Sequence, residues 1–196
     1  MTPNSPVQAI PPIVLRQRLR PAAFTVGHGT LPAAEFIALL RGAKIAAVAD
    51  VRVVPRSRHN PQFSIEALSR NLVSAGIAYT HFKDLGGWRR PDPKSPNVSL
   101  RNDAFRGYAD YMQTDQFACA VDALLEDLIA RPTALMCSES VWWRCHRRLL
   151  ADYLALARGW EVFDLLHDGR CERHRITPGA RSTPEGLVYD APVEVP

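Results

Sequence analysis

The chain has 196 residues, of which 46% are hydrophobic and 22% charged, and it carries a formal net charge of +4 with a sequence pI near 9.1. These values are ordinary for a soluble globular protein with one sizeable core. The mild positive charge permits an anionic substrate or a nucleic acid, but it is weaker than the dense basic stripe expected of a dedicated DNA-binding protein.

The cysteine pattern and the absence of long apolar runs indicate where the protein works. Four cysteines without a CxxC pair suggest neither a disulfide scaffold nor a zinc ribbon. No uninterrupted apolar run is long enough to span a bilayer. Residues 1–21 hold prolines and a basic segment but no signal-peptide pattern, so we expect a flexible leader and a cytoplasmic protein with no membrane contact. Residues 22–196 are expected to form a single α/β domain.

The first half of that domain alternates strand and helix patterns. Residues 24–30 predict a short strand that ends in His28, which is flanked by two glycines, and residues 33–40 predict a helix. The unalternated apolar run at 44–52 is typical of a strand buried on both faces, as in a parallel sheet. A loop at 53–63 then carries several basic residues.

The second half continues the alternation. Further expected elements are a helix from the N-cap Ser64 to Gly76, a strand at 77–82, an irregular region at 88–103, a helix at 105–130 with a break near Thr114, a strand at 133–136, a helix ending at Gly159 and a strand at 161–166. From about residue 175 we expect an irregular tail with a short edge strand at 187–189. The pattern predicts a three-layer α/β/α sandwich with a mainly parallel sheet of about five strands.

The stretch 133–150 carries the most reactive side chains. An apolar strand leads into Cys137-Ser-Glu139, a loop with two tryptophans follows, and Arg144-Cys-His-Arg147 opens a helix. A buried strand, a polar loop and a helix N-terminus in this order form the part of an α/β fold where ligands usually bind. The sequence therefore predicts a site here.

Several motifs together resemble a family of bacterial and archaeal proteins grouped as domain of unknown function 488. They extend over about residues 24–181 and are Val26-Gly-His-Gly-Thr30, Asp50-Val-Arg52, Ser57-Arg-His-Asn-Pro-Gln-Phe63, Leu85-Gly-Gly87, Phe105-Arg-Gly-Tyr-Ala-Asp-Tyr-Met112, Cys137-Ser-Glu139, Cys145-His-Arg147 and His174-Arg-Ile-Thr-Pro178. The resemblance implies an α/β fold and no particular reaction.

A weaker resemblance is to rhodanese-like domains. It rests on Asp50-Val-Arg52 at a strand end, and on Cys137 after a later strand, followed by Arg144 and a helix. In those domains and in cysteine-dependent phosphatases the cysteine is the nucleophile and the loop amides hold an anion. The phosphatase spacing is not met, because six residues separate Cys137 from Arg144 rather than five. This likeness is at the level of the fold.

Cys137 and Glu139 are the candidate catalytic residues. Helix dipoles and nearby arginines would stabilise a Cys137 thiolate, whereas a Glu139 carboxylate in the same pocket would disfavour it. Alternation in an extended segment puts the two side chains on the same side, where Glu139 would serve as a general base. The alternatives are a Cys137 packed as a small hydrophobe and a Glu139 paired with Arg147 or Arg52.

The candidate substrate-binding residues surround that pair. They are His28, Arg52, Arg56, Arg58, Cys145, His146 and Arg147. The alternatives for this set are structural hydrogen bonds, fold-closing ion pairs and a solvated basic rim that includes Arg89 and Arg90. Trp88, Trp142 and Trp143 are candidates for stacking a base or sugar.

We expect no metal and no cofactor. The spacing of Cys137, Cys145 and His146 matches no common zinc site, and a fourth ligand such as His28 or His174 would have to be added.

The pattern favours an enzyme that acts on an anionic substrate, with a nucleotide or nucleic-acid component, by hydrolysis or group transfer. One alternative is rhodanese-like sulfur or phosphoryl transfer by Cys137. Another is a non-enzymatic nucleic-acid-binding module. The oligomeric state is not specified by the sequence.

Overall fold

The computed structural model describes residues 21–56, 59–184 and 186–192. Within these ranges the chain forms a six-stranded sheet with the order β3-β2-β4-β1-β5-β6 and a separate two-stranded hairpin. The strands are β1 (Ala22–Gly27), β2 (Ala47–Asp50), β3 (Ala78–His81), β4 (Thr133–Cys137), β5 (Glu161–Leu165), β6 (Cys171–Arg173), β7 (Ala180–Thr183) and β8 (Gly186–Tyr189). The neighbouring pairs among β1 to β5 are parallel, and β6 is antiparallel to β5.

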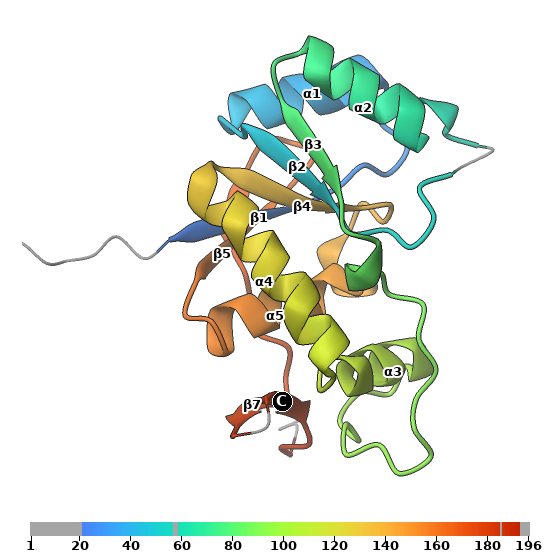
Figure 1. Ribbon diagram of the computed structural model, residues 1–196, viewed down its shortest axis with the longest axis vertical. Helices are drawn as coiled ribbons and strands as arrows, with labels where there is room; N and C mark the ends of the chain where they lie inside the picture. Colours follow the sequence, from blue (N-terminus) through green and yellow to red (C-terminus); the bar gives the residue numbers. More distant parts are fainter. Residues whose placement is uncertain (1–20, 57–58, 185, 193–196) are drawn as a thin grey trace, which may run out of the picture.

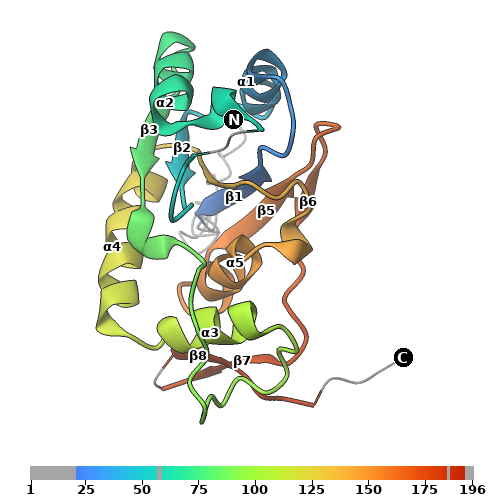
Figure 2. The same ribbon diagram turned by 90° about the vertical axis from the view of Figure 1, so that its right-hand side faces the viewer.

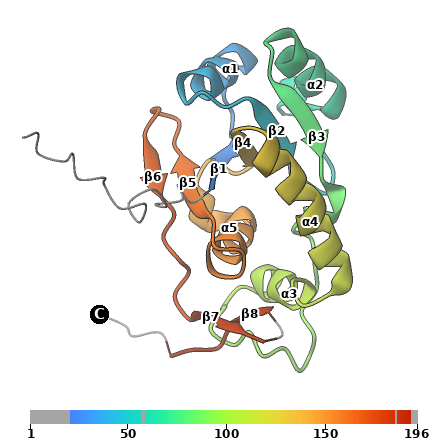
Figure 3. The same ribbon diagram turned by 60° about the vertical axis from the view of Figure 1, so that its left-hand side comes forward.

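In the described part of the chain, five α-helices and three short 3-10 helices connect the strands (Figure 1). They are α1 (Ala33–Gly42), η1 (Pro61–Phe63), α2 (Ile65–Ser74), η2 (Lys83–Leu85), α3 (Asp103–Tyr111), α4 (Asp115–Ala130), η3 (Trp142–Arg144) and α5 (Arg147–Leu156). The helices α1 and α2 cover one face of the sheet, and α4 and α5 cover the other (Figure 3). The predicted three-layer α/β/α sandwich is therefore confirmed.

Each face of the sheet has its own apolar core. Val26, Val48 and Met136 pack with Phe36 and Leu40 of α1 on one face. The residues of the other face pack with α3, α4 and α5. Because the central strands are covered on both sides, their sequences are continuously apolar, as the run at 44–52 predicted.

The strand register brings the predicted motifs to one edge. Gly27 at the end of β1 is paired with Cys137 at the end of β4, and Asp50 at the end of β2 is paired with Met136. The connection from β1 leads through α1 on one face toward β2, whereas the connection from β4 leads through α5 on the other face toward β5 (Figures 1 and 3). The carboxyl ends of β1 and β4 thus lie at a topological switch point, where α/β proteins usually bind ligands.

Local signals in the sequence place several helix ends correctly. The Ser64 hydroxyl accepts a hydrogen bond from the Ala67 amide and caps α2. Gly76 follows α2 with a φ of 78°, which glycine adopts without strain. Thr114 separates α3 from α4 and caps α4, as the predicted break required.

The C-terminal region is more regular than the predicted tail. A turn at Gly169 returns the chain as β6, which adds an antiparallel sixth strand to the sheet. Beyond it β7 and β8 form a hairpin that lies beside α3 (Figure 2). Leu187 and Tyr189 of β8 are fully buried against that side of the domain. Of the predicted leader, residues 1–20 lie outside the described residues, and Pro21 accepts a hydrogen bond from Glu161.

A buried polar cluster ties the C-terminal region to the domain. The His174 ring lies 3.0 Å from a carboxylate oxygen of Asp152 and 2.9 Å from one of Asp164. The hydroxyls of Thr25 and Tyr189 donate to the same two carboxylates. Burial alone would lower the pKa of His174, but the two carboxylates raise it to about 9. His174 is therefore a buried cation between two anions at neutral pH.

This cluster predicts a stability that falls at alkaline pH. Because the pKa of His174 is higher in the folded state than in the unfolded chain, the cluster stabilises the fold fully below about pH 6.5 and loses this contribution as the pH rises through about 9. The free energy of unfolding, measured in urea, is expected to drop by roughly 2–3 kcal/mol between about pH 6 and about pH 9.5. His59→Gln, which changes an exposed histidine, should show the same drop. A free energy that stays constant or increases over this range would contradict the ion-pair cluster.

No helix within the described ranges combines the length and apolar composition that a membrane-crossing segment requires.

Candidate functional site

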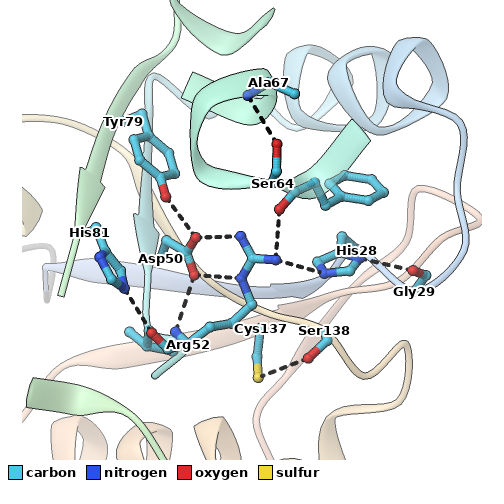
Figure 4. A network of polar contacts seen from close by, with 12 residues as sticks. His28, Gly29, Asp50, Arg52, Ser64, Ala67, Tyr79, His81, Cys137 and Ser138 are labelled. Atoms are coloured by element: carbon cyan, nitrogen blue, oxygen red, sulfur yellow. Dashed lines mark hydrogen bonds and ion pairs between the residues drawn. The ribbon is translucent and has the colours of Figure 1, made fainter. Parts of the chain in front are cut away.

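The carboxyl end of β2 carries a buried ion pair (Figure 4). The Arg52 guanidinium donates two hydrogen bonds to the Asp50 carboxylate, at 2.8 and 2.5 Å, and both side chains are almost fully buried. Tyr79 of β3 donates a third hydrogen bond to Asp50 at 2.8 Å. The remaining terminal nitrogen of Arg52 contacts the Phe63 carbonyl at 3.0 Å and His28 at 3.2 Å. The pair therefore joins β1, β2, β3 and η1 beneath the site.

His28 is held as a neutral ring in this network. Its Nδ1 donates to the Gly29 carbonyl at 2.8 Å, which leaves Nε2 to accept from Arg52. The ring also stacks on Phe63 with centroids 4.0 Å apart. Burial is the main cause that lowers the pKa of His28 to about 4. Since both ring nitrogens are occupied, the geometry gives His28 a positioning role.

The loop after β4 is fixed from below by Arg147. This buried side chain of α5 donates to the carbonyls of Glu139 and Ser140, at 2.6 and 3.2 Å. A β-carbon on Gly27 would lie 1.7 Å from the same Glu139 carbonyl, so only glycine allows β1 to approach the loop. Arg147 thus shapes the site by binding its backbone.

Cys137, Cys145 and His146 meet at the base of this loop. Their two sulfurs and the Nδ1 atom of His146 all lie within 4.8 Å of one another. His146 Nδ1 is 3.8 Å from the Cys137 sulfur and 3.7 Å from the Cys145 sulfur. Its Nε2 donates to the Val51 carbonyl at 3.0 Å, which leaves the lone pair of Nδ1 facing the sulfurs. The arrangement is one that two thiols and an imidazole use to share protons or to bind a metal ion.

The two cysteines differ in acidity. The hydrogen bond with Cys145 is the main cause that raises the pKa of Cys137 well above its ordinary value, and burial adds to it. Burial alone would also raise the pKa of Cys145, but the Cys137 hydrogen bond and the charge and backbone amide of Arg147 lower it. Cys145, close to the start of α5, is therefore the more acidic thiol of the pair.

Glu139 lies beside Cys137, which donates a hydrogen bond from its sulfur to the carboxylate at 3.3 Å. Burial alone would raise the pKa of Glu139, but this bond and a bond to the backbone hold the pKa below its ordinary value. Glu139 is thus ionised at neutral pH and is able to accept a proton but not to donate one at the start of a reaction.

Two adjoining pockets open around Glu139. The cysteine pocket, of about 80 Å³, is lined by Arg52, Val53, Val54, Gly87, Trp88, Cys137, Ser138, Glu139 and His146. The histidine pocket, of about 370 Å³, is lined by His28, Gly29, Thr30, Arg52, Val54, Arg56, Asn60, Ser138, Glu139 and Ser140. Because Arg52, Val54, Ser138 and Glu139 line both, the pockets adjoin and Glu139 lies where they meet.

The structure brings most of the predicted site residues to these two pockets. The catalytic candidates Cys137 and Glu139 line the cysteine pocket together with Arg52 and His146, while His28 and Arg56 line the histidine pocket. Cys145 and Arg147 lie behind the pocket wall, next to its lining residues. Arg58 lies outside the described residues.

The three tryptophans of the sequence analysis have different surroundings. Trp88 lines the cysteine pocket and is 78% exposed. Trp142 packs edge-on against Trp143 and against His174, away from the pocket lining. Arg89 is directed elsewhere too, since its guanidinium lies over the ring of Tyr111.

Several residues that support the site were not among the predicted site residues. Tyr79 binds Asp50, His81 donates to the Arg52 carbonyl at 2.8 Å, and Phe63 stacks on His28. The strand predicted at 77–82 contained the signal, because Tyr79 and His81 alternate toward its carboxyl end. Recognising their role required the register that pairs His81 with Asp50.

A larger cavity of about 670 Å³ lies elsewhere, between the 98–105 segment, α5 and the region after β8. Arg101 and Arg148 line it, but its one lining carboxylate, Asp190, already forms an ion pair with Arg181. Among the described residues, no cysteine or histidine is part of this lining. The two smaller pockets are therefore the better candidates for the functional site, because they hold the reactive side chains.

Fold and site together define an α/β/α protein with a cysteine-, histidine- and glutamate-lined pocket at the carboxyl edge of its sheet. The model of the family described as "Domain of unknown function DUF488" matches residues 32–154, which is more than half of the chain. The chain therefore belongs to this family, as its motifs predicted. The rhodanese-like resemblance is not confirmed, and neither the curated proteins nor the solved structures gave a match.

Proposed function

We propose that the protein is an enzyme that acts on an anionic substrate with a nucleotide or nucleic-acid component, by hydrolysis or group transfer, with Glu139 as the proton acceptor. The position of the Glu139 carboxylate supports this most strongly. It is ionised and lies where the two pockets meet. A carboxylate in that state and position suits a general base acting on a bound substrate or water.

The histidine pocket has the features needed to hold an anion. Arg56 lines it as an exposed cation, while the charge of Arg52 is compensated by Asp50. The hydroxyl-bearing side chains of Thr30, Ser138 and Ser140 line the same space. Cations and hydroxyls together suit a phosphate group.

Trp88 supplies the complementary surface for a base. Its indole is 78% exposed and borders the cysteine pocket. A base that stacks on this ring would place its phosphate within reach of the histidine pocket, because the two pockets adjoin.

Replacing Trp88 with alanine is expected to raise the dissociation constant of a bound nucleotide by about 5- to 150-fold, the range given by about 1–3 kcal/mol of stacking. Isothermal titration calorimetry with nucleoside mono- and diphosphates measures this constant. Trp143→Ala is the matched control, because Trp143 is also exposed but lies outside both pocket linings. Equal losses in the two variants would contradict stacking on Trp88.

The proposal is tested by incubating the full chain with nucleosides, nucleotides and short oligonucleotides and detecting products by mass spectrometry. Turnover that stops with Glu139→Gln and persists with Glu126→Gln, an exposed glutamate of α4, would support the enzyme. Salt-sensitive binding of oligonucleotides without any product, unchanged by Glu139→Gln, would instead support the non-enzymatic module.

The structure does not favour thiol transfer by a cysteine nucleophile. Such a nucleophile has to be both ionised and accessible. Cys137 lines the pocket but has a raised pKa, whereas Cys145 has the lowered pKa but lies outside the pocket lining. Accessibility and a lowered pKa are thus found on two different cysteines.

A further inference from the structure

The distances among Cys137, Cys145 and His146 are close to those of a zinc site. With zinc–sulfur and zinc–nitrogen bonds of about 2.3 and 2.0 Å, a tetrahedral ion holds its sulfur and nitrogen ligands about 3.5 Å apart. In this protein the two sulfur–nitrogen distances are 3.8 and 3.7 Å. Shortening these two distances by a few tenths of an ångström would bring the Nδ1 atom into ligand geometry with each sulfur, and the two sulfurs lie within 4.8 Å of each other.

The imidazole of His146 is oriented as a metal ligand would be. Its Nε2 donates to the Val51 carbonyl, so the lone pair of Nδ1 faces both sulfurs. Ligating histidines usually donate their second nitrogen in this way. Tyr108 packs edge-on against the ring at 5.1 Å, and a β-carbon on Gly87 would lie 2.4 Å from its Cγ atom. The surroundings thus hold the ring in one orientation.

We propose that Cys137, Cys145 and His146 bind one zinc ion, and that its fourth position faces the cysteine pocket and holds a water molecule beside Glu139. The proposal rests on the function proposed above and assigns its chemistry to a metal-bound water. It replaces the expectation of no metal, which rested on the spacing of these residues along the chain. That spacing does not show that the end of β4 and the start of α5 lie side by side in the fold.

The chemistry of the donors selects the metal. Two thiolates and an imidazole suit zinc, whereas magnesium and calcium require oxygen ligands. Three protein ligands with one open position are typical of catalytic zinc sites, and four protein ligands are typical of structural ones. The two histidines considered as a fourth ligand already have partners on both ring nitrogens. His28 contacts Arg52 and Gly29, and His174 contacts two aspartates.

Glu139 is placed to exchange protons with a water in the open position. Its carboxylate lies 3.3 Å from the Cys137 sulfur and lines the cysteine pocket. The water would give one proton to Glu139 and become a zinc-bound hydroxide, which attacks the substrate. As the bond to the leaving group breaks, Glu139 returns that proton to the leaving group, so the net reaction is addition of one water. A glutamate two residues after a zinc ligand is also the order found in nucleobase deaminases.

The first test is the zinc content of the full chain. The protein is produced with zinc in the medium, dialysed without chelator and analysed by mass spectrometry of the metal. We expect about one zinc per chain in the wild type and in Cys119→Ser and Cys171→Ser, which change the two exposed cysteines. Cys137→Ser and His146→Ala should hold at least about tenfold less. A wild type with no more zinc than these two variants would overturn the proposal.

The second test uses the wild-type chain and so does not depend on a variant that could fail to fold. Cobalt bound to the wild-type chain in place of zinc should give the intense visible bands of a tetrahedral site and a near-ultraviolet band from thiolate ligands. Adding azide should shift the visible bands, because the fourth position is open. Weak octahedral bands, or bands that azide leaves unchanged, would overturn the three-ligand site.

Glu139→Gln separates this proposal from the proposed function. The variant should keep its zinc, since Glu139 is assigned to the water and not to the metal. Loss of zinc in Glu139→Gln would overturn the assignment by making Glu139 the fourth ligand. If the wild type turns over nucleotides without zinc and chelators have no effect, the metal proposal fails while the enzyme proposal stands.

Discussion

Replacing Arg52 with methionine is expected to lower the free energy of unfolding by about 3–5 kcal/mol. The substitution leaves the Asp50 carboxylate fully buried without its bidentate partner. It also removes the contacts that Arg52 makes with Phe63 and His28, so η1 and the end of β1 lose their common link. Urea unfolding of the wild type and the variant measures the difference.

A surface ion pair provides the matched control. Arg106 and Asp103 are paired on the exposed side of α3, where solvent screens the charges. Arg106→Met should therefore change the free energy of unfolding by less than about 1 kcal/mol. If Arg52→Met were no more destabilising than Arg106→Met, Asp50 and Arg52 would not be the structural support of the site.

The fold could be predicted from the sequence because its signals are local. The apolar run at 44–52, the N-cap at Ser64 and the glycine at position 76 depend on neighbouring residues alone. The edge strand predicted at 187–189 is present as β8, but β6 and β7 were not predicted. The residues of β6 and β7 are mostly polar and show no apolar alternation, and these strands are ordered by pairing with β5 and β8.

The candidate site was predicted in its location but not in its internal contacts. Motifs at strand ends indicate which edge of the sheet carries the site. They do not show that His28 is neutral, or that Cys145 rather than Cys137 is the more acidic thiol. These properties depend on burial and on contacts between strands that are far apart in sequence.

The second large effect is expected from Glu139→Gln, which should reduce turnover of the substrate by about 10²- to 10⁴-fold. The amide has nearly the same shape but cannot accept a proton. Because the Glu139 carboxylate is ionised in the free protein, the wild-type rate should decrease as the pH falls through the lowered pKa of this group. The pH dependence should be lost in the variant.

Binding and chemistry can be separated in the same experiment. Glu139→Gln should leave the dissociation constant of the nucleotide within about threefold, since the anion is assigned to the Arg56 side of the histidine pocket. Glu126→Gln should keep both the rate and the affinity of the wild type. Full activity of the Glu139→Gln variant would contradict the role of Glu139 as the proton acceptor.

The central claim is that the two adjoining pockets around Glu139 bind the substrate. Amide chemical-shift mapping tests it most directly, by titrating the isotope-labelled full chain with nucleoside phosphates. Binding there should give shifts concentrated at Gly29, Thr30, Gly87 and residues 138–140, which line the two pockets. Shifts confined to the cavity lined by Arg101 and Arg148 would contradict it and move the binding site to that cavity.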